Sequence, residues 1–102
     1  MNNVFNKIYD LTYLPLLTPS NLIESLKVDN FISINYSKNE IGIIADVRCF
    51  VDKKEMSFIY QFDQKDFLIS IHYIEDGKIE YLFNRNLELK DLRKEYIKSK
   101  VL

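Results

Sequence analysis

Residues 41–62 read IGIIADVRCFVDKKEMSFIYQF, two runs of alternating character separated by a polar turn at 52–55. Alternation with a period of two is typical of a β-strand that buries one face. The residues that share the apolar face of these two runs are Ile41, Ile43, Ala45, Val47, Cys49 and Val51, then Met56, Phe58, Tyr60 and Phe62. Because parallel strands need a crossover of a dozen residues or more, so short a connection predicts an antiparallel pair.

The same pattern extends on both sides of this pair. Residues 31–37 alternate before it, and residues 67–74 and 79–83 alternate after it. Polar turns separate the runs, and Asp76-Gly77 in the last turn is a strong hairpin signal. The sequence therefore predicts an antiparallel β-meander of about five strands.

A helical period replaces this alternation near the start of the chain. The stripe of Val4, Phe5, Ile8 and Leu11 predicts a first helix that ends before Pro15. Thr18 followed by Pro19 then predicts a helix N-cap with proline in the first turn. The apolar stripe of this second helix is Leu22, Ile23 and Leu26.

The last segment also has a helical period. Asn86 is the expected cap, and Leu89, Leu92 and Tyr96 form a stripe with Ile97 beside it. We therefore expect an α+β fold with an N-terminal helical segment, a meander of about five strands and a C-terminal amphipathic helix. The helices are expected on one side of the sheet, and residues 1–102 form a single domain.

Length and composition narrow the setting. The 102 residues carry a net charge of −1, which disfavours a strongly basic nucleic-acid-binding class. A single cysteine excludes an intrachain disulfide and, with no signal-peptide features or spanning apolar run, predicts a cytoplasmic protein without membrane contact. Abundant Ile, Lys and Asn beside one Ala indicate A/T-rich coding DNA, as in low-GC bacteria and phages.

One face of the predicted sheet gathers nearly all the aromatic residues of the strands. They are Tyr36, Phe58, Tyr60, Phe62, Phe67, Tyr73, Tyr81 and Phe83. We interpret this face as a core covered by one or both helices, because each large apolar side chain gains about 1.5–3 kcal/mol on burial. A cavity for a small ligand between sheet and helix is the alternative.

The other face is mixed, although a solvated face of an antiparallel sheet is expected to be mostly polar. Its residues are Phe31, Ile44, Asp46, Arg48, Phe50, Ile59, Gln61, Leu68, Ser70, His72, Ile74, Glu80 and Leu82. Exposed contiguous apolar area on a soluble protein usually marks an interaction surface. The candidate partner-binding residues are Ile44, Asp46, Arg48, Phe50, Ile59, Gln61, Leu68, His72 and Leu82. Coverage of this face by the N-terminal helix is the alternative.

Residues with catalytic chemistry are few. Two glycines provide no phosphate-binding loop, and one cysteine and one histidine provide no structural zinc site, so we expect no cofactor and no metal. His72 with Asp46, Arg48 and Glu80 on neighbouring strands is the single arrangement compatible with a general base, and we favour a solvated or interface histidine instead. Cys49 on the apolar face is expected to act as a small buried hydrophobe.

Basic residues of the last helix are a weak signal for nucleic acid. Lys98 and Lys100 lie at its end, but Glu88, Asp91 and Glu95 share the same helix. A solvated helix surface explains this pattern, so nucleic-acid binding is disfavoured.

We therefore expect a protein-binding module that is not an enzyme. Within that class we favour a small bacterial or phage inhibitor, of the immunity-protein or antitoxin type, that masks another protein through the mixed face. This choice of class rests on the fact that low-GC mobile genetic elements commonly carry genes for such inhibitors. The alternatives are a homodimer joined through the same face or through an edge strand, or a protein that binds a small ligand.

Overall fold

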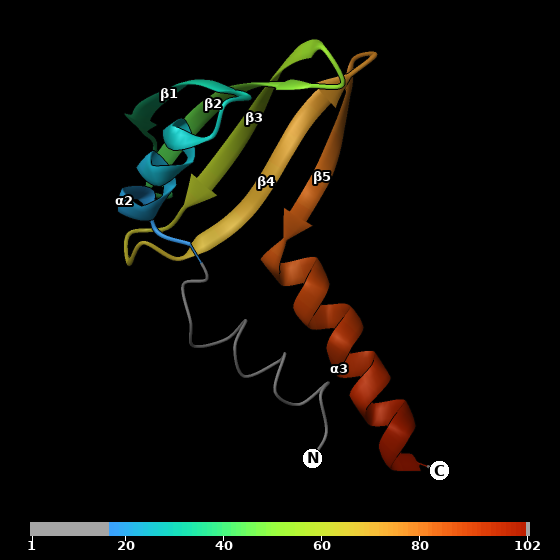
Figure 1. Cartoon of the computed structure of the whole chain (residues 1–102). Helices are drawn as coiled ribbons and strands as arrows, with labels where there is room; N and C mark the ends of the chain where they lie inside the picture. Colours follow the sequence, from blue (N-terminus) through green and yellow to red (C-terminus); the bar gives the residue numbers. More distant parts are fainter. Residues whose placement is uncertain (1–16, 102) are drawn as a thin grey trace.

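The structure, a computed structural model, describes residues 17–101 (Figure 1). The expected first helix, with Val4, Phe5, Ile8 and Leu11, lies outside the described residues. In chain order the elements are α2 (Pro19–Leu22), the 3-10 helix η1 (Ile23–Lys27), β1 (Phe31–Lys38), β2 (Ile43–Val51), β3 (Lys54–Phe62), β4 (Leu68–Glu75), β5 (Lys78–Asn84) and α3 (Arg85–Val101).

The five strands form one antiparallel sheet in the order β1-β2-β3-β4-β5, which confirms the predicted meander and the α+β class. Two-residue turns connect β2 to β3 and β4 to β5. Asp52 and Lys53, and likewise Asp76 and Gly77, have positive φ angles, as the hairpin turns that match strand twist require. None of the helices in residues 17–101 combines the length and apolar content needed to cross a bilayer.

The helical segment before β1 begins as predicted. The Thr18 hydroxyl accepts a hydrogen bond from the Asn21 backbone N–H at 3.2 Å, and Pro19 occupies the first turn. The α-helix lasts only four residues and continues as η1, whose tighter turn changes the face that each residue presents. Leu22 is buried as predicted, whereas Ile23 and Leu26 are exposed.

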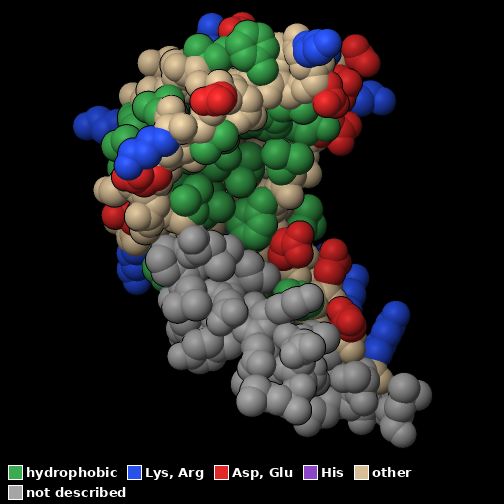
Figure 2. Space-filling model, viewed as in Figure 1, with side chains coloured by type: hydrophobic (Ala, Val, Ile, Leu, Met, Phe, Trp, Pro, Cys, Tyr) green, Lys and Arg blue, Asp and Glu red, His purple; other side chains and the backbone are tan. Residues whose placement is uncertain are grey.

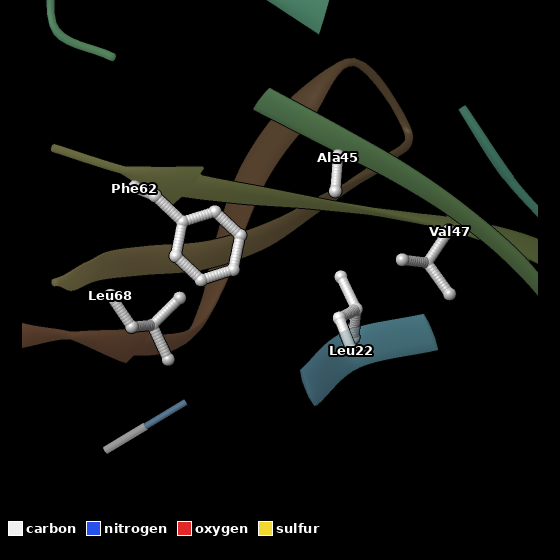
Figure 3. Packing of buried hydrophobic residues seen from close by; sticks show 5 residues of the cluster. All are labelled: Leu22, Ala45, Val47, Phe62 and Leu68. Carbon is white, nitrogen blue, oxygen red and sulfur yellow. The ribbon is translucent and has the colours of Figure 1, made fainter. Parts of the chain in front are cut away.

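The core lies where this segment meets the sheet (Figure 3). Leu22 contacts a cluster of buried side chains from β2, β3 and β4, namely Ala45, Val47, Phe62 and Leu68. We call the face of the sheet that carries this cluster the inner face, and the opposite face, which carries Ile44, Asp46 and Ile59, the outer face. Tyr36 ties β1 to the helical segment, because its hydroxyl donates to the Pro19 carbonyl at 2.7 Å.

Gly42 allows the β1–β2 turn to lie against the end of β3. A Cβ at this position would overlap the Phe62 carbonyl oxygen and lie 2.6 Å from the Asp63 carbonyl carbon. The Asn39 side chain closes the turn by accepting hydrogen bonds from the N–H groups of Ile41 and Gly42. Glycine is therefore required here by close approach of two backbones.

The C-terminal helix α3 follows β5 directly and runs away from the end of the sheet (Figure 1). Arg85 in its first turn is buried, and its Nε donates to the Leu68 carbonyl at 2.6 Å. The Arg85 guanidinium also lies over the Phe67 ring, 5.2 Å from the ring centroid. Asn84 caps the helix by accepting from the Leu87 N–H at 3.2 Å, so the expected cap at Asn86 is wrong. Of the described helical elements, α2 and η1 cover the sheet, and α3 extends beyond it.

Three register shifts correct the predicted assignment of residues to faces. In each, one strand holds an extra residue opposite its neighbour, and these residues are Ile32, Ile69 and Leu82. A bulge reverses the alternation beyond it, which a strict period of two does not anticipate. Phe31 therefore pairs with Cys49 on the inner face, although the alternation predicted the mixed face.

Candidate functional site

The outer face carries side chains in continuous rows across the strands. One row contains Asn35, Asp46, Ile59, His72 and Tyr81, and the next contains Ser37, Ile44, Gln61, Ser70 and Asn84. Residues that face each other in an antiparallel pair have Cβ atoms about 4.5–5.5 Å apart, so each row is a contiguous strip of surface. The outer face is therefore one connected surface formed by all five strands.

Most of the candidate partner-binding residues do lie together on this face. Those brought together on β2, β3 and β4 are Ile44, Asp46, Arg48, Phe50, Ile59, Gln61 and His72. Phe50 and Arg48 are exposed, and Ile44, Ile59 and His72 are half-buried.

Leu68 and Leu82 do not belong to this group. Leu68 pairs with Phe62, is buried, and is part of the core, so its assignment to the mixed face is wrong. The extra residue Ile69 moved it to the inner side. Leu82 is itself a bulge residue and lines a hollow with Phe58 and Tyr73, whose rings meet edge to face at 5.6 Å on the inner face.

The structure adds three large apolar residues that the candidate set lacks. Ile74, Ile79 and Tyr81 are 66%, 56% and 51% exposed on the outer side of β4 and β5. Ile74 pairs directly with Ile79, and the Tyr81 ring lies 5.8 Å from the His72 ring. The alternation had placed Tyr81 in the aromatic core, together with Ile79 two residues before it, which is wrong because the bulge at Leu82 separates both from the face of Phe83.

A sequence signal for Ile79 was present. A two-residue turn at Asp76-Gly77 sets Glu75 opposite Lys78 and Ile74 opposite Ile79, as the structure shows. Residues that face each other across a ladder share a face. Since Ile74 was assigned to the mixed face, the turn required Ile79 on that face too.

Two polar side chains of this face differ in how their hydrogen bonds are satisfied. Gln61 accepts from the Asn39 amide at 2.8 Å and donates to the Phe62 carbonyl at 2.8 Å, so it helps to hold the β1–β2 turn. Asp46 Oδ1 is buried and finds no hydrogen-bond partner among residues 17–101. An unsatisfied buried acceptor costs about 1–3 kcal/mol, so Asp46 is an acceptor that a suitable donor would stabilise.

The general-base arrangement around His72 is not assembled. The cross-strand neighbours of His72 are Ile59 and Tyr81, and Asp46 lies one strand further, about 10 Å away at the usual strand spacing. Glu80 pairs with Tyr73 and therefore lies on the inner side. Within the described residues, no group of three or more His, Cys, Asp or Glu side chains is placed to hold a metal ion.

An open hollow of about 340 Å³ lies where β3 and β4 diverge. The pairing of the two strands runs from Ile59 opposite His72 to Phe62 opposite Leu68. Beyond it, Met56 and Ser57 of β3 line the hollow together with residues of the β4 end. Figure 2, in the view of Figure 1, looks onto the side of the sheet that α2 and η1 cover and shows hydrophobic side chains gathered over the middle of the sheet, with charged ones around them.

Comparison of the chain with protein-family models, with curated proteins and with solved structures found no match.

Proposed function

We propose that the chain is a non-enzymatic protein-binding module that docks through the outer patch, defined as Ile59, His72, Ile74, Ile79 and Tyr81. The observation that carries this proposal is the adjacent, exposed set of Ile74, Ile79 and Tyr81. Exposed apolar side chains scattered singly are ordinary, but a contiguous group on one face marks a site of association.

The polar residues beside the outer patch support the same function. Protein interfaces combine an apolar centre with a polar rim that supplies hydrogen bonds and charges. Arg48 is exposed on the outer side of β2, and Asp46 lies half-buried next to Ile59. The partner surface is therefore expected to be apolar at its centre, with polar groups that face Arg48.

Within this class we favour an inhibitor that masks its partner, of the immunity-protein or antitoxin type, from a bacterium or phage. The support is the small size of the chain and its composition. A cytoplasmic location belongs to this proposal and is supported by the single cysteine, Cys49, which is free and buried.

The experiment that tests this function uses the tagged full chain to recover partners from the lysate of its source cells. The test variant is Ile74→Asp, which places a charge in the outer patch. The matched control is Ile41→Asp, because Ile41 is also an exposed isoleucine (53%) but lies in the β1–β2 turn. A stoichiometric partner that Ile74→Asp loses and Ile41→Asp keeps supports the proposal.

Two further variants locate the edge of the docking surface. Ile44 lies on the outer face of β2, so Ile44→Asp should weaken binding of the recovered partner. Leu82 lines the hollow on the inner face, so Leu82→Asp should leave this binding unchanged. Recovery of no partner, or equal binding by wild type and Ile74→Asp, would contradict the proposal.

A further inference from the structure

Strand β5 is the last strand of the sheet, and in the described part of the chain no strand lies beyond it. The side chains of Lys78, Ile79, Glu80, Tyr81 and Leu82 are all exposed. An edge strand presents unpaired backbone N–H and C=O groups, which form a template for pairing with another strand. No described strand or helix covers this edge, so the side chains of β5 determine which strand can pair with it.

The charges of β5 follow a simple pattern. Lys78 and Glu80 are two residues apart, so both project to the inner side, whereas Ile79 and Tyr81 project to the outer side. This regular stretch ends at the bulge residue Leu82. Pairing along the free edge is therefore limited to the residues from the hairpin turn to Tyr81.

We propose that β5 pairs antiparallel with β5 of a second copy of this chain, about a two-fold axis at Ile79. In this register Lys78 of each copy faces Glu80 of the other, so two cross-strand charge pairs form. The two Ile79 side chains meet at the centre. The strand is thus complementary to itself in charge, and the contact is isologous as a two-fold dimer requires.

Neighbouring registers lack this complementarity. An axis at Glu80 would place the two Glu80 carboxylates opposite each other, and like charges in this position are destabilising. An axis at Tyr81 would place Glu80 opposite Leu82, where the bulge interrupts regular pairing. Charge complementarity therefore selects both the second copy and the register.

Such a dimer has one continuous ten-stranded sheet, because the two five-stranded sheets join at their β5 edges. The two-fold axis is perpendicular to the sheet. The outer faces of both copies therefore point to the same side, and their Ile79 side chains become adjacent. Pairing of one short strand buries little surface, which places the dimer among weak, reversible interfaces. This inference stands on the β5 edge and does not require the proposed partner.

The first measurement is sedimentation of the full chain over a range of concentrations. We expect a mass that rises from 12.2 kDa toward twice that value. The first variant is Glu80→Lys. Within its own hairpin Glu80 faces the uncharged Tyr73, so this substitution removes no charge pair inside the monomer. It places lysine opposite Lys78 in both pairs and should weaken the dimer about tenfold or more.

Charge exchange makes the test specific. Lys78→Glu alone should weaken the dimer as Glu80→Lys does, and the double variant Lys78→Glu/Glu80→Lys should restore it. A mixture of the two single variants should form a mixed dimer, since each then supplies the charges that the other needs. Circular dichroism of each variant checks the fold, because Lys78 also faces Glu75 within the hairpin.

A chain that stays monomeric at every concentration would overturn this inference, as would a dimer that Glu80→Lys leaves unchanged. Failure of the partner proposal is distinguishable, because Ile74→Asp tests docking on the outer patch and Glu80→Lys tests the strand edge. If the wild type dimerises and Glu80→Lys retains its captured partner while losing the dimer, both proposals hold.

Discussion

The two edge strands of the sheet have opposite surroundings. Strand β1 is packed against the helical segment, with Phe31 and Ile34 contacting the core and the Tyr36 hydroxyl bonded to Pro19. Strand β5 is of similar length, yet among its residues Phe83 is the one that packs against the core. The inner side of β1 is held by the helical segment, and most of β5 has no such contact among the described residues.

Side-chain composition does not explain this difference. The outer side of β1 carries Ser33, Asn35 and Ser37, whereas the outer side of β5 carries Ile79 and Tyr81. The strand with the more apolar outer side thus has less of its length packed against the core. The reason is connectivity, because the segment before β1 folds back onto the inner face, while α3 continues past the end of β5 (Figure 1). Exposure of apolar residues on an open edge is what suggests a role in association.

The largest expected effect distinguishes the core next to the helical segment, which we call the covered region, from the open strand β5. Phe62→Ala removes the largest fully buried side chain and should lower the free energy of unfolding by about 3–5 kcal/mol. Ile79→Ala on the open edge should change it by about 0.5 kcal/mol or less. Denaturant unfolding of the monomer at low concentration measures both. Equal losses would show that the two regions contribute alike.

The turns that lead to the two regions provide the next comparison. Gly42→Ala forces a Cβ against the backbone of Phe62 and Asp63 and should cost about 1–3 kcal/mol of stability. Gly77 has a φ of +77° with open space around it, so Gly77→Asn should be nearly neutral because asparagine tolerates this conformation. Thermal melts of the two variants check the order. A neutral Gly42→Ala would mean that the β1–β2 turn does not lie close to the backbone of Phe62 and Asp63.

A smaller effect is expected from the contact that holds β1. Tyr36→Phe removes the hydrogen bond to the Pro19 carbonyl and should cost about 0.5–1 kcal/mol. Tyr81→Phe on β5 removes a hydroxyl from an exposed side chain and serves as the matched control. Denaturation curves that shift equally for both would argue against a specific contact at the β1 edge.

The covered region should also lose stability in alkali. Burial raises the pKa of the Cys49 thiol above its ordinary 9.0 and that of the Tyr60 hydroxyl above its ordinary 10.0. A second, smaller cause at Tyr60 is the charge of Cys49. As pH rises through these ordinary values, the unfolded chain releases protons that the folded chain retains, so stability falls. Melting temperatures measured from pH 7 upward should decline beyond pH 9, and Tyr60→Phe should reduce the decline.

Local sequence signals predicted much of this fold correctly. The alternation in residues 41–62 and the short polar turns predicted the order and direction of the strands, and Thr18-Pro19 predicted the start of α2. The face of each residue was predicted less well. Strict alternation placed Leu68 outside and Tyr81 inside, and bulges at Ile69 and Leu82 reversed both. A bulge depends on how one strand meets the next, so its signal within one strand is weak.

For the candidate site, the alternation in residues 44–61 correctly predicted that β2 and β3 present Asp46, Ile59 and Gln61 on a common face. These strands pair without a shift between Ile44 and Val51, so a period of two is sufficient. For Ile79 the Asp76-Gly77 turn already carried the signal, whereas the bulge at Leu82, which separates the face of Tyr81 from that of Phe83, was set by strand pairing in the tertiary structure. The tertiary structure also decided that the inner side of β1 packs against the helical segment while most of β5 does not pack against the core. Burial depends on where the connecting segments pack, and this is set by contacts between residues far apart in the chain.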